Sequence, residues 1–329
     1  MSSPLLEVRD LRTEFRTRDG VVRAVNSISF DLGAGEALGF VGESGSGKSV
    51  TALSILQLFG PFTDAQIGGQ VLYDGRDLLK LRGNRMRKIR GREIGMIFQD
   101  PLTSLNPLMP VGQQVAECIR LHESVSRDMA TRRATELLEL VGIPDPKNRF
   151  NDLPHSFSGG MRQRIMIAIA VACKPRILIA DEPTTALDVT VQAQILLLLN
   201  DLQRELGMAL IMISHDFGVV AATCDRVNVM YGGRIVEHAY TEELFRSANH
   251  PYTEGLLKLV PSLEQRRGEQ LVPISGQPPD VFNMPPGCSF APRCPHVVDL
   301  CNEKQPELTV LGPSHGSACW MAEQRRLPR

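Results

Sequence analysis

The sequence predicts an α/β core with a mostly parallel sheet, a helical subdomain inserted into that core, and a small cysteine-bearing tail. Three observations predict this fold class. Strand-like and helical patterns alternate around a glycine-rich loop, the stretch from about 100 to 171 is helical, and the composition turns rich in proline and glycine after about residue 262. A chain of 329 residues, 43% of them apolar and 22% charged, is long enough for one sizeable domain and a small one.

The expected strands and helices follow one another along the chain. Residues 5–9 and 24–30 alternate like strands at a sheet edge, with a turn signal at Asp19 and Gly20 between them. Residues 37–41 form a near-continuous apolar run, which is typical of a buried parallel strand. Further strands are expected at 71–73, 94–98, 177–180 and 209–213, and helices at about 49–58, 115–121, 129–141 and 191–206.

Bulk properties narrow the class of protein. The net charge of −1 gives no global field that would favour nucleic acid. The first four residues lack the basic and apolar regions of a signal peptide. The longest strongly apolar stretch, 165–173, is far too short to span a bilayer. We therefore expect a cytosolic chain, unless another protein holds it at a membrane.

A phosphate loop is predicted at residues 42–49, which read GESGSGKS and fit the pattern G-x-x-x-x-G-K-[ST] between an expected strand and an expected helix. The glycines let successive backbone N–H groups converge on phosphate oxygens, and the helix start adds positive potential. We expect Lys48 to reach the β- and γ-phosphates of a nucleoside triphosphate and Ser49 to ligate Mg²⁺. The alternative is a chance glycine turn.

Two carboxylates follow the apolar run at 177–180 and so stand at the C-terminal end of an expected strand. Ligands bind at that end of the strands in open α/β sheets. We expect Asp181 to contact the Mg²⁺ shell and Glu182 to polarise an attacking water. The alternative is a solvated pair that opens a turn at Pro183, which the phosphate loop upstream makes the weaker interpretation.

Four of the seven cysteines crowd the tail, at Cys288, Cys294, Cys301 and Cys319. In a reducing cytosol such a cluster indicates a metal site before it indicates disulfides. The segment is too short and too rich in proline and glycine to build its own core, so a metal centre would staple it. The spacings are wider than those of most structural zinc sites. Four thiols fit an iron–sulfur cluster, while zinc and no metal remain the alternatives.

Further motifs carry a resemblance to a known family. Residues 157–164 read FSGGMRQR, Gln99 follows an expected strand, residues 186–188 read ALD, and residues 214–216 read SHD. In this order they resemble the signature, Q-loop, D-loop and switch histidine of ATP-binding cassette (ABC) ATPases. Phe15 matches the position that stacks on adenine, although a core phenylalanine is the rival interpretation. The resemblance implies an ABC-type P-loop NTPase fold, in which a RecA-like core carries an antiparallel β edge and an inserted α-helical subdomain.

Longer stretches resemble one branch of that family, the ATPase subunits of oligopeptide and dipeptide import systems. Those stretches are 97–107 (IFQDPLTSLNP), 180–188 (ADEPTTALD), 250–253 (HPYT) and 292–295 (PRCP). The resemblance implies an ABC nucleotide-binding domain over 1–262, with its helical subdomain at about 100–171. It also implies a transporter-type C-terminal extension over 263–329, whose four cysteines would hold a [4Fe–4S] cluster.

The resemblance further implies that two chains share each nucleotide. The signature residues would cap the γ-phosphate held by a partner's phosphate loop. His215 would contact the γ-phosphate and position the water of Glu182, and Gln99 would report the γ-phosphate to the surface that touches the membrane subunits. The residues expected to bind ATP are Phe15, Gly42, Ser44, Gly45, Gly47, Lys48, Ser49, Ser158, Gly159, Gly160 and Asp188. Those expected to act in hydrolysis are Glu182, His215 and Gln99, and those expected to hold Mg²⁺ are Ser49, Gln99 and Asp181.

The implied assembly lies peripherally on the cytoplasmic face of the cell membrane. It pairs the chain with a homologous ATPase subunit, as a homodimer or heterodimer, on two transmembrane permease subunits. An extracytoplasmic peptide-binding protein would serve it indirectly, and no nucleic acid is involved. Nickel or glutathione is the alternative cargo. A soluble ABC ATPase of DNA repair or translation is a distant alternative, because the chain has one cassette and a compact insertion. The basic run at 82–92 suggests a lipid contact, with a solvated face as the simpler interpretation.

Overall fold

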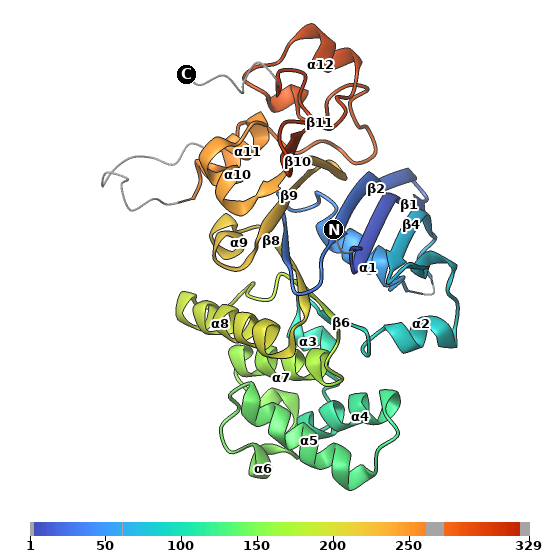
Figure 1. Ribbon diagram of the computed structural model, residues 1–329, viewed down its shortest axis with the longest axis vertical. Coiled ribbons are helices and arrows are strands. Elements are labelled where there is room, and N and C mark those ends of the chain that lie inside the picture. Colours follow the sequence, from blue (N-terminus) through green and yellow to red (C-terminus); the bar gives the residue numbers. More distant parts are fainter. Residues whose placement is uncertain (1–2, 61, 261–272, 323–329) are drawn as a thin grey trace. The chain divides into compact units, whose positions relative to one another are not determined.

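The computed structural model describes residues 3–60, 62–260 and 273–322 (Figure 1). The chain divides into two units. Unit 1 is made of segments 1–32, 37–79 and 214–329, and unit 2 of segments 33–36 and 80–213. The boundary expected between residues 262 and 263 lies outside the described residues. In the part of the chain that is described, no helix is both long and apolar enough to cross a membrane.

One sheet of unit 1 is antiparallel, with the strand order β2-β1-β4-β5. Strands β1 (Leu6–Thr17) and β2 (Gly20–Leu32) form a hairpin whose last pair joins Thr17 to Gly20, at the turn signal seen in the sequence. Strand β4 (Ala65–Tyr73) pairs with the other side of β1, and the short β5 (Arg76–Asp77) pairs with β4. The expected antiparallel edge is therefore present, and its strands are longer than the sequence predicts.

The remaining strands of unit 1 are β3 (Ala37–Val41) and the strands that pair with it directly or through a neighbouring strand. All five residues of β3 are buried, and the strand pairs in parallel with β9 (Arg226–Tyr231). Strand β10 (Arg234–Tyr240) is antiparallel to β9 and pairs in turn with β12 (Gly316–Ser317). The C-terminal segment thus adds β12, and through it β11 (Thr309–Val310), to the edge of the same unit.

The helices of unit 1 flank these strands. Helix α1 (Lys48–Ile55) follows β3 and is shorter at its C-terminus than the expected helix 49–58. Thr13 of β1 and Ser54 of α1 share a buried hydrogen bond of 2.7 Å. The other helices are α9 (Phe217–Thr223), α10 (Thr241–Ser247), α11 (Pro251–Leu257) and α12 (Asp299–Glu303), with the 3₁₀ turns η1 (Leu78–Lys80), which ends in unit 2, and η3 (Ala291–Arg293).

Unit 2 contains three parallel strands, β6 (Ile94–Ile97), β7 (Ile177–Asp181) and β8 (Ala209–Ser214). Strands β7 and β8 are buried at every position, as apolar strands between covered faces must be. Helix α8 (Val189–Leu206) connects them. It begins where the Asp188 side chain accepts a hydrogen bond from the Val191 N–H, and it ends at Gly207 in the left-handed region, with φ of 63°.

The other secondary-structure elements of unit 2 are helices, and no strand interrupts residues 101–171, all of which are described. Helices α4 (Val111–His122), α5 (Arg127–Leu140) and α7 (Gly159–Val171) are the long ones. Gly112 of α4 allows a close approach, because a Cβ there would lie 2.3 Å from the Phe150 ring. The short elements are α2 (Asn84–Ile89), α3 (Pro101–Ser104), α6 (Pro146–Arg149) and η2 (Pro154–Ser156).

Candidate nucleotide site

The phosphate loop of unit 1 depends on its glycines. Gly42, Gly45 and Gly47 all have positive φ, at 150°, 78° and 103°. A Cβ on Gly42 would lie 2.2 Å from the Met230 carbonyl oxygen, and one on Gly47 would lie 2.4 Å from a backbone oxygen of β2. Both positions therefore exclude any side chain, on conformational and on steric grounds.

Lys48 is enclosed by the loop that it belongs to, with 4% of its surface exposed. Its Nζ donates to the Gly42 carbonyl at 2.8 Å, to the Glu43 carbonyl at 2.9 Å and to the Ser46 hydroxyl at 3.3 Å. The ammonium is therefore already placed inside the ring of backbone groups. Residues Ser44, Gly45 and Ser46 line one wall of a cavity of about 340 Å³, a size typical of ligand pockets.

Ser49 and Phe15 are the other expected nucleotide contacts of unit 1. Ser49 is the second residue of α1 and is half-buried. Phe15 lies near the end of β1 and is also half-buried, with its ring 5.4 Å from that of Phe59 in an edge-to-face arrangement. Phe15 is therefore not a fully enclosed core residue, and part of its ring can meet a ligand.

In unit 2, Glu182 follows strand β7 with φ of 47°, in the left-handed region that residues other than glycine rarely adopt. Its Oε2 accepts two hydrogen bonds, one from Gln99 Nε2 at 3.1 Å and one from the Thr185 hydroxyl at 2.9 Å. The structure thus brings together two of the residues expected to act in hydrolysis. Thr185 was not among them, although it lies in the ADEPTTALD stretch.

Asp181, the last residue of β7, is 5% exposed. The residues expected to hold Mg²⁺ would supply a carboxylate from Asp181, a hydroxyl from Ser49 and an amide oxygen from Gln99. Oxygen donors of this kind are the ones that Mg²⁺ prefers, so the residue types fit the ion.

The signature lies at the start of α7 in unit 2. The Ser158 hydroxyl accepts from the Met161 N–H at 3.4 Å and so caps the helix. Gly160 packs closely on α8, since a Cβ there would lie 2.6 Å from Val191 Cγ1. At Gly159 the nearest atom to such a Cβ is Leu187 Cδ2 at 3.8 Å, an ordinary contact. Ser158 and Gly159 are exposed, so this helix start presents N–H groups to the surface.

Two further expected residues also belong to helix starts. Asp188 is exposed, and one of its carboxylate oxygens caps α8. His215 follows β8 and is exposed. The next residue, Asp216, caps α9 by accepting from the Gly218 N–H at 2.7 Å. His215 belongs to unit 1 and Glu182 to unit 2.

The four tail cysteines line one small cavity, together with His250, His296 and Trp320. Its volume of about 20 Å³ has room for roughly one water. Burial, reinforced by the neighbouring cysteines, raises the pKa of Cys288 to about 11. Within the described residues, no three or more His, Cys, Asp or Glu side chains are arranged to hold a metal ion. The thiols are therefore neighbours, but they do not form a ready-made metal site.

Comparison with known proteins agrees with this geometry. Residues 25–185 match the family model described as ABC transporter. Among solved structures, the ATP-binding cassette MJ0796, dimeric in a post-hydrolysis state with ADP and Pi, is similar with a TM-score of 0.64 and 27% identity, over 72% of this chain and 98% of that one. CbiO1 from Clostridium perfringens is similar with a TM-score of 0.62 and 28% identity, over 74% and 92%. The class is therefore the ATP-hydrolysing cassette of ABC transporters, with its P-loop NTPase fold.

Relatives that match over nearly the whole chain show which branch of this class the chain belongs to. Residues 236–301 match the family model described as oligopeptide/dipeptide transporter, C-terminal region. The probable peptide ABC transporter ATP-binding protein y4tR of Sinorhizobium fredii is 52% identical over 97% of this chain and 96% of its own length. The dipeptide transport protein DppD of Bacillus subtilis is 49% identical (98% and 96%), and the oligopeptide transport protein OppD of Salmonella typhimurium 50% identical (96% and 93%). The chain belongs to the ATP-binding subunits of the oligopeptide/dipeptide permease family.

Proposed function

We propose that this chain hydrolyses ATP to drive an importer for dipeptides or oligopeptides. The observation that carries the proposal is the match to the transporter-type C-terminal region, combined with relatives about 50% identical over nearly their full length that are named for peptide transport. Nickel and glutathione remain the alternative cargoes, because the residues that handle ATP do not contact the cargo.

When ATP binds, its phosphates would replace the carbonyl oxygens that now accept hydrogen bonds from the lysine of the phosphate loop. Lys48 Nζ now donates to the carbonyl oxygens of Gly42 and Glu43. Phosphate oxygens carry more negative charge than carbonyls, so the β- and γ-phosphates would take over these hydrogen bonds. The loop N–H groups and the start of α1 would add to the positive potential. Phe15 would stack on the adenine ring.

Hydrolysis would depend on Glu182. Gln99 and Thr185 both donate to its Oε2, which fixes the carboxylate plane, and the carboxylate would orient a water towards the γ-phosphate. His215 would contact the same phosphate. Ser49, Gln99 and Asp181 would hold Mg²⁺, which when bound neutralises charge on the phosphates.

The signature would act on ATP held by a second chain. Ser158 and Gly159 are exposed at the start of a 13-residue helix, where N–H groups and the helix dipole favour an anion. The partner would be a second copy or a homologous ATPase subunit. The pair would work peripherally on the cytoplasmic face of the membrane with two permease subunits, and an extracytoplasmic peptide-binding protein would deliver the cargo.

Glu182→Gln tests the enzymatic part. It keeps the acceptor for Gln99 and Thr185 but removes the base, so we expect ATP affinity within about twofold of wild type and turnover lowered by about 10²–10⁴-fold. Undiminished hydrolysis would contradict the mechanism. The cargo is tested in a deletion strain, which should lose growth on peptides as the sole amino-acid source and recover it with the wild-type chain but not with Glu182→Gln. A strain that loses only nickel or glutathione uptake would refute peptide cargo.

We also propose that the tail cysteines are the site of a [4Fe–4S] cluster. Support comes from the placing of all four thiols around one cavity. At about 20 Å³ that cavity would have to widen to admit a cluster. Protein purified without oxygen should contain iron and sulfide and be coloured, and substitution of Cys301 by Ser should remove the metal and the colour. A colourless, iron-free and active sample would refute the cluster.

A further inference from the structure

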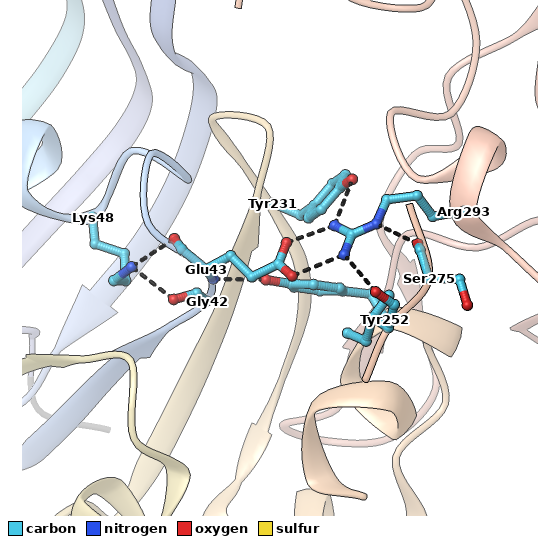
Figure 2. Close-up of polar contacts among 8 residues, drawn as sticks. Gly42, Glu43, Lys48, Tyr231, Tyr252, Ser275 and Arg293 are labelled. Carbon is cyan, nitrogen blue, oxygen red and sulfur yellow. Dashed lines mark hydrogen bonds and ion pairs between the residues drawn. The ribbon is translucent and has the colours of Figure 1, made fainter. Parts of the chain in front are cut away.

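The C-terminal segment makes a direct ionic contact with the phosphate loop (Figure 2). The Arg293 guanidinium binds both carboxylate oxygens of Glu43, with Nη1–Oε2 at 2.6 Å and Nη2–Oε1 at 2.9 Å. Glu43 is the second residue of the phosphate loop, 250 positions earlier in the chain. A bidentate arginine–carboxylate pair is among the strongest and most directional polar contacts in proteins.

The arginine itself is held firmly. Its side chain is 4% exposed, whereas that of Glu43 is 27% exposed. Its Nε donates to the Ser275 carbonyl at 3.0 Å and its Nη1 to the Tyr231 hydroxyl at 3.3 Å. The hydrogen bond to Glu43 is the main cause of a raised pKa for Arg293, which stays charged in any case. The guanidinium is therefore a fixed positive charge beside the loop.

Glu43 is held through its backbone as well. Its N–H donates to the hydroxyl of Tyr252, a fully buried residue of α11, at 2.7 Å. Its carbonyl accepts from Lys48 Nζ. The peptide groups on both sides of Glu43 are thus tied, one to α11 and the other to the lysine that would bind phosphate. Arg293 holds the side chain between these two ties.

We propose that Arg293 is a positioning residue for the phosphate loop, which acts through Glu43 to hold the loop in its ATP-binding form and to neutralise the carboxylate there. The second role follows from charge. Glu43 places a negative group in a loop built to bind a triphosphate, and an unpaired carboxylate would repel that ligand. Arg293 cancels the charge, so the C-terminal segment takes part in nucleotide binding without touching the nucleotide.

The inference rests on the chain's ATP-binding class and is independent of the cargo. The test is titration of the purified full-length chain with MgADP, which cannot be hydrolysed. We expect Arg293→Ala to raise the Kd about tenfold, equivalent to about 1.4 kcal/mol. The change should shrink in 1 M salt, because the repulsion by the bare carboxylate is screened.

The double variant Glu43→Gln/Arg293→Ala separates positioning from simple support of the fold. It removes the uncompensated charge, so we expect it to bind MgADP several-fold more tightly than Arg293→Ala alone. Arg293→Lys keeps the charge but cannot make the bidentate contact, so its Kd should fall between wild type and Arg293→Ala. If Arg293→Ala does not fold, Arg293→Gln and Glu43→Gln/Arg293→Gln form the same comparison, because glutamine also removes the positive charge.

Arg226→Ala is the matched control, because it breaks another ion pair of unit 1, with Asp31 at 3.0 Å, and should leave the Kd within twofold. The proposal is overturned if Arg293→Ala binds MgADP like wild type, or if the double variant binds no better than Arg293→Ala. Failure of the wild-type chain to bind MgADP would instead contradict the ATP-binding role.

Discussion

Two helix starts in the described residues are rich in glycine, and they are built in opposite ways. At the phosphate loop, Gly42 and Gly47 have positive φ and lie against backbone oxygens, and Lys48 is buried. At the signature, Gly159 and Gly160 are not among the glycines with positive φ, and the helix is capped by the exposed Ser158. The first site is enclosed by its own chain, and the second is presented outward.

This difference indicates which ligand each site is shaped for. An enclosed loop has a fixed geometry before ATP arrives, so little ordering is required on binding. The signature has no lysine and no enclosing segment among its described contacts, so a phosphate would need to be brought to it by another body. Both sites would bind an anion at a helix start. The phosphate loop would bind the nucleotide of its own chain, and the signature would bind the nucleotide held by a second chain.

The same substitution at the two starts should have opposite consequences, and this is the largest expected effect. Gly47→Ala places a Cβ 2.4 Å from a backbone oxygen at a φ of 103°, with a combined cost of about 4 kcal/mol. We expect the isolated chain to lose measurable ATP binding. Gly159→Ala meets its nearest atom at 3.8 Å, so fold and ATP affinity should be kept while turnover falls. ATP titration, thermal melting and hydrolysis assays measure the three quantities, and equal losses of ATP affinity in both variants would break the comparison.

Mixing two inactive variants tests whether the sites belong to different chains. Lys48→Ala disables the loop and Gly159→Asp places a negative charge at the signature, so each alone should be inactive. If two copies of this chain pair, the mixture should recover about a quarter of wild-type turnover, because half of the dimers are mixed and each keeps one intact site. The matched control mixes Lys48→Ala with Glu182→Gln. Both residues act on the nucleotide held by their own chain, so no site in this mixed dimer is intact and no turnover should be recovered. No recovery in the first mixture, with dimers shown to form, would contradict the shared site.

Thr185→Val sharpens the comparison on the hydrolytic side. It removes one of the two hydrogen bonds to Glu182 Oε2 and preserves the shape of the side chain. The loss of one such bond is worth about 0.5–1.5 kcal/mol, so we expect turnover to fall about two- to tenfold with ATP affinity unchanged. Thr185→Ser, which keeps the hydroxyl, should restore most of the rate. A change in ATP affinity without a change in turnover would show that Thr185 serves the fold instead.

The smallest effect concerns the support of the C-terminal segment. His315 binds Glu237 at 2.8 Å and Glu243 at 3.1 Å. The hydrogen bond to Glu237 is the main cause of the raised pKa of His315. For the nearby His238, burial and the charge of His315 lower the pKa. A raised folded pKa stabilises the fold below the unfolded value near 6.5, and this stabilisation is lost as the pH rises through the folded value. The free energy of unfolding of wild type relative to His315→Gln should therefore shrink by about 1 kcal/mol between pH 6 and pH 9. Urea unfolding measures it, and a difference that grows with pH would reverse the assignment.

The parts of the fold that the sequence predicts are those set by local pattern. The apolar runs at 37–41, 177–180 and 209–213 became β3, β7 and β8 almost residue for residue, because parallel strands covered on both faces must be apolar throughout. Strands β9 and β10 were missed. They carry Asn228, Glu237 and His238 among their apolar residues, and these break the pattern.

Within the candidate site, motifs predict which residues lie in the loop but not what holds the loop in place. Tyr252 and Arg293 stood in stretches noted only for their resemblance to peptide importers. Their contacts with Glu43 join positions 209 and 250 residues apart, and no periodicity or spacing encodes such a distance. Thr185 was not predicted for a different reason. A threonine in a turn can hydrogen-bond to several nearby backbone groups, so its presence there does not indicate a contact with Glu182.

The position of Arg293 within η3, directly before Cys294, limits how this protein can be engineered. A C-terminal segment transplanted from a relative would bring its own residue to face the acid at position 43. Unless both are exchanged together, the chimera would either leave a carboxylate beside the triphosphate or bury a guanidinium with no counterion. Designers of hybrid transport motors should therefore treat residues 43 and 293 as one inseparable unit.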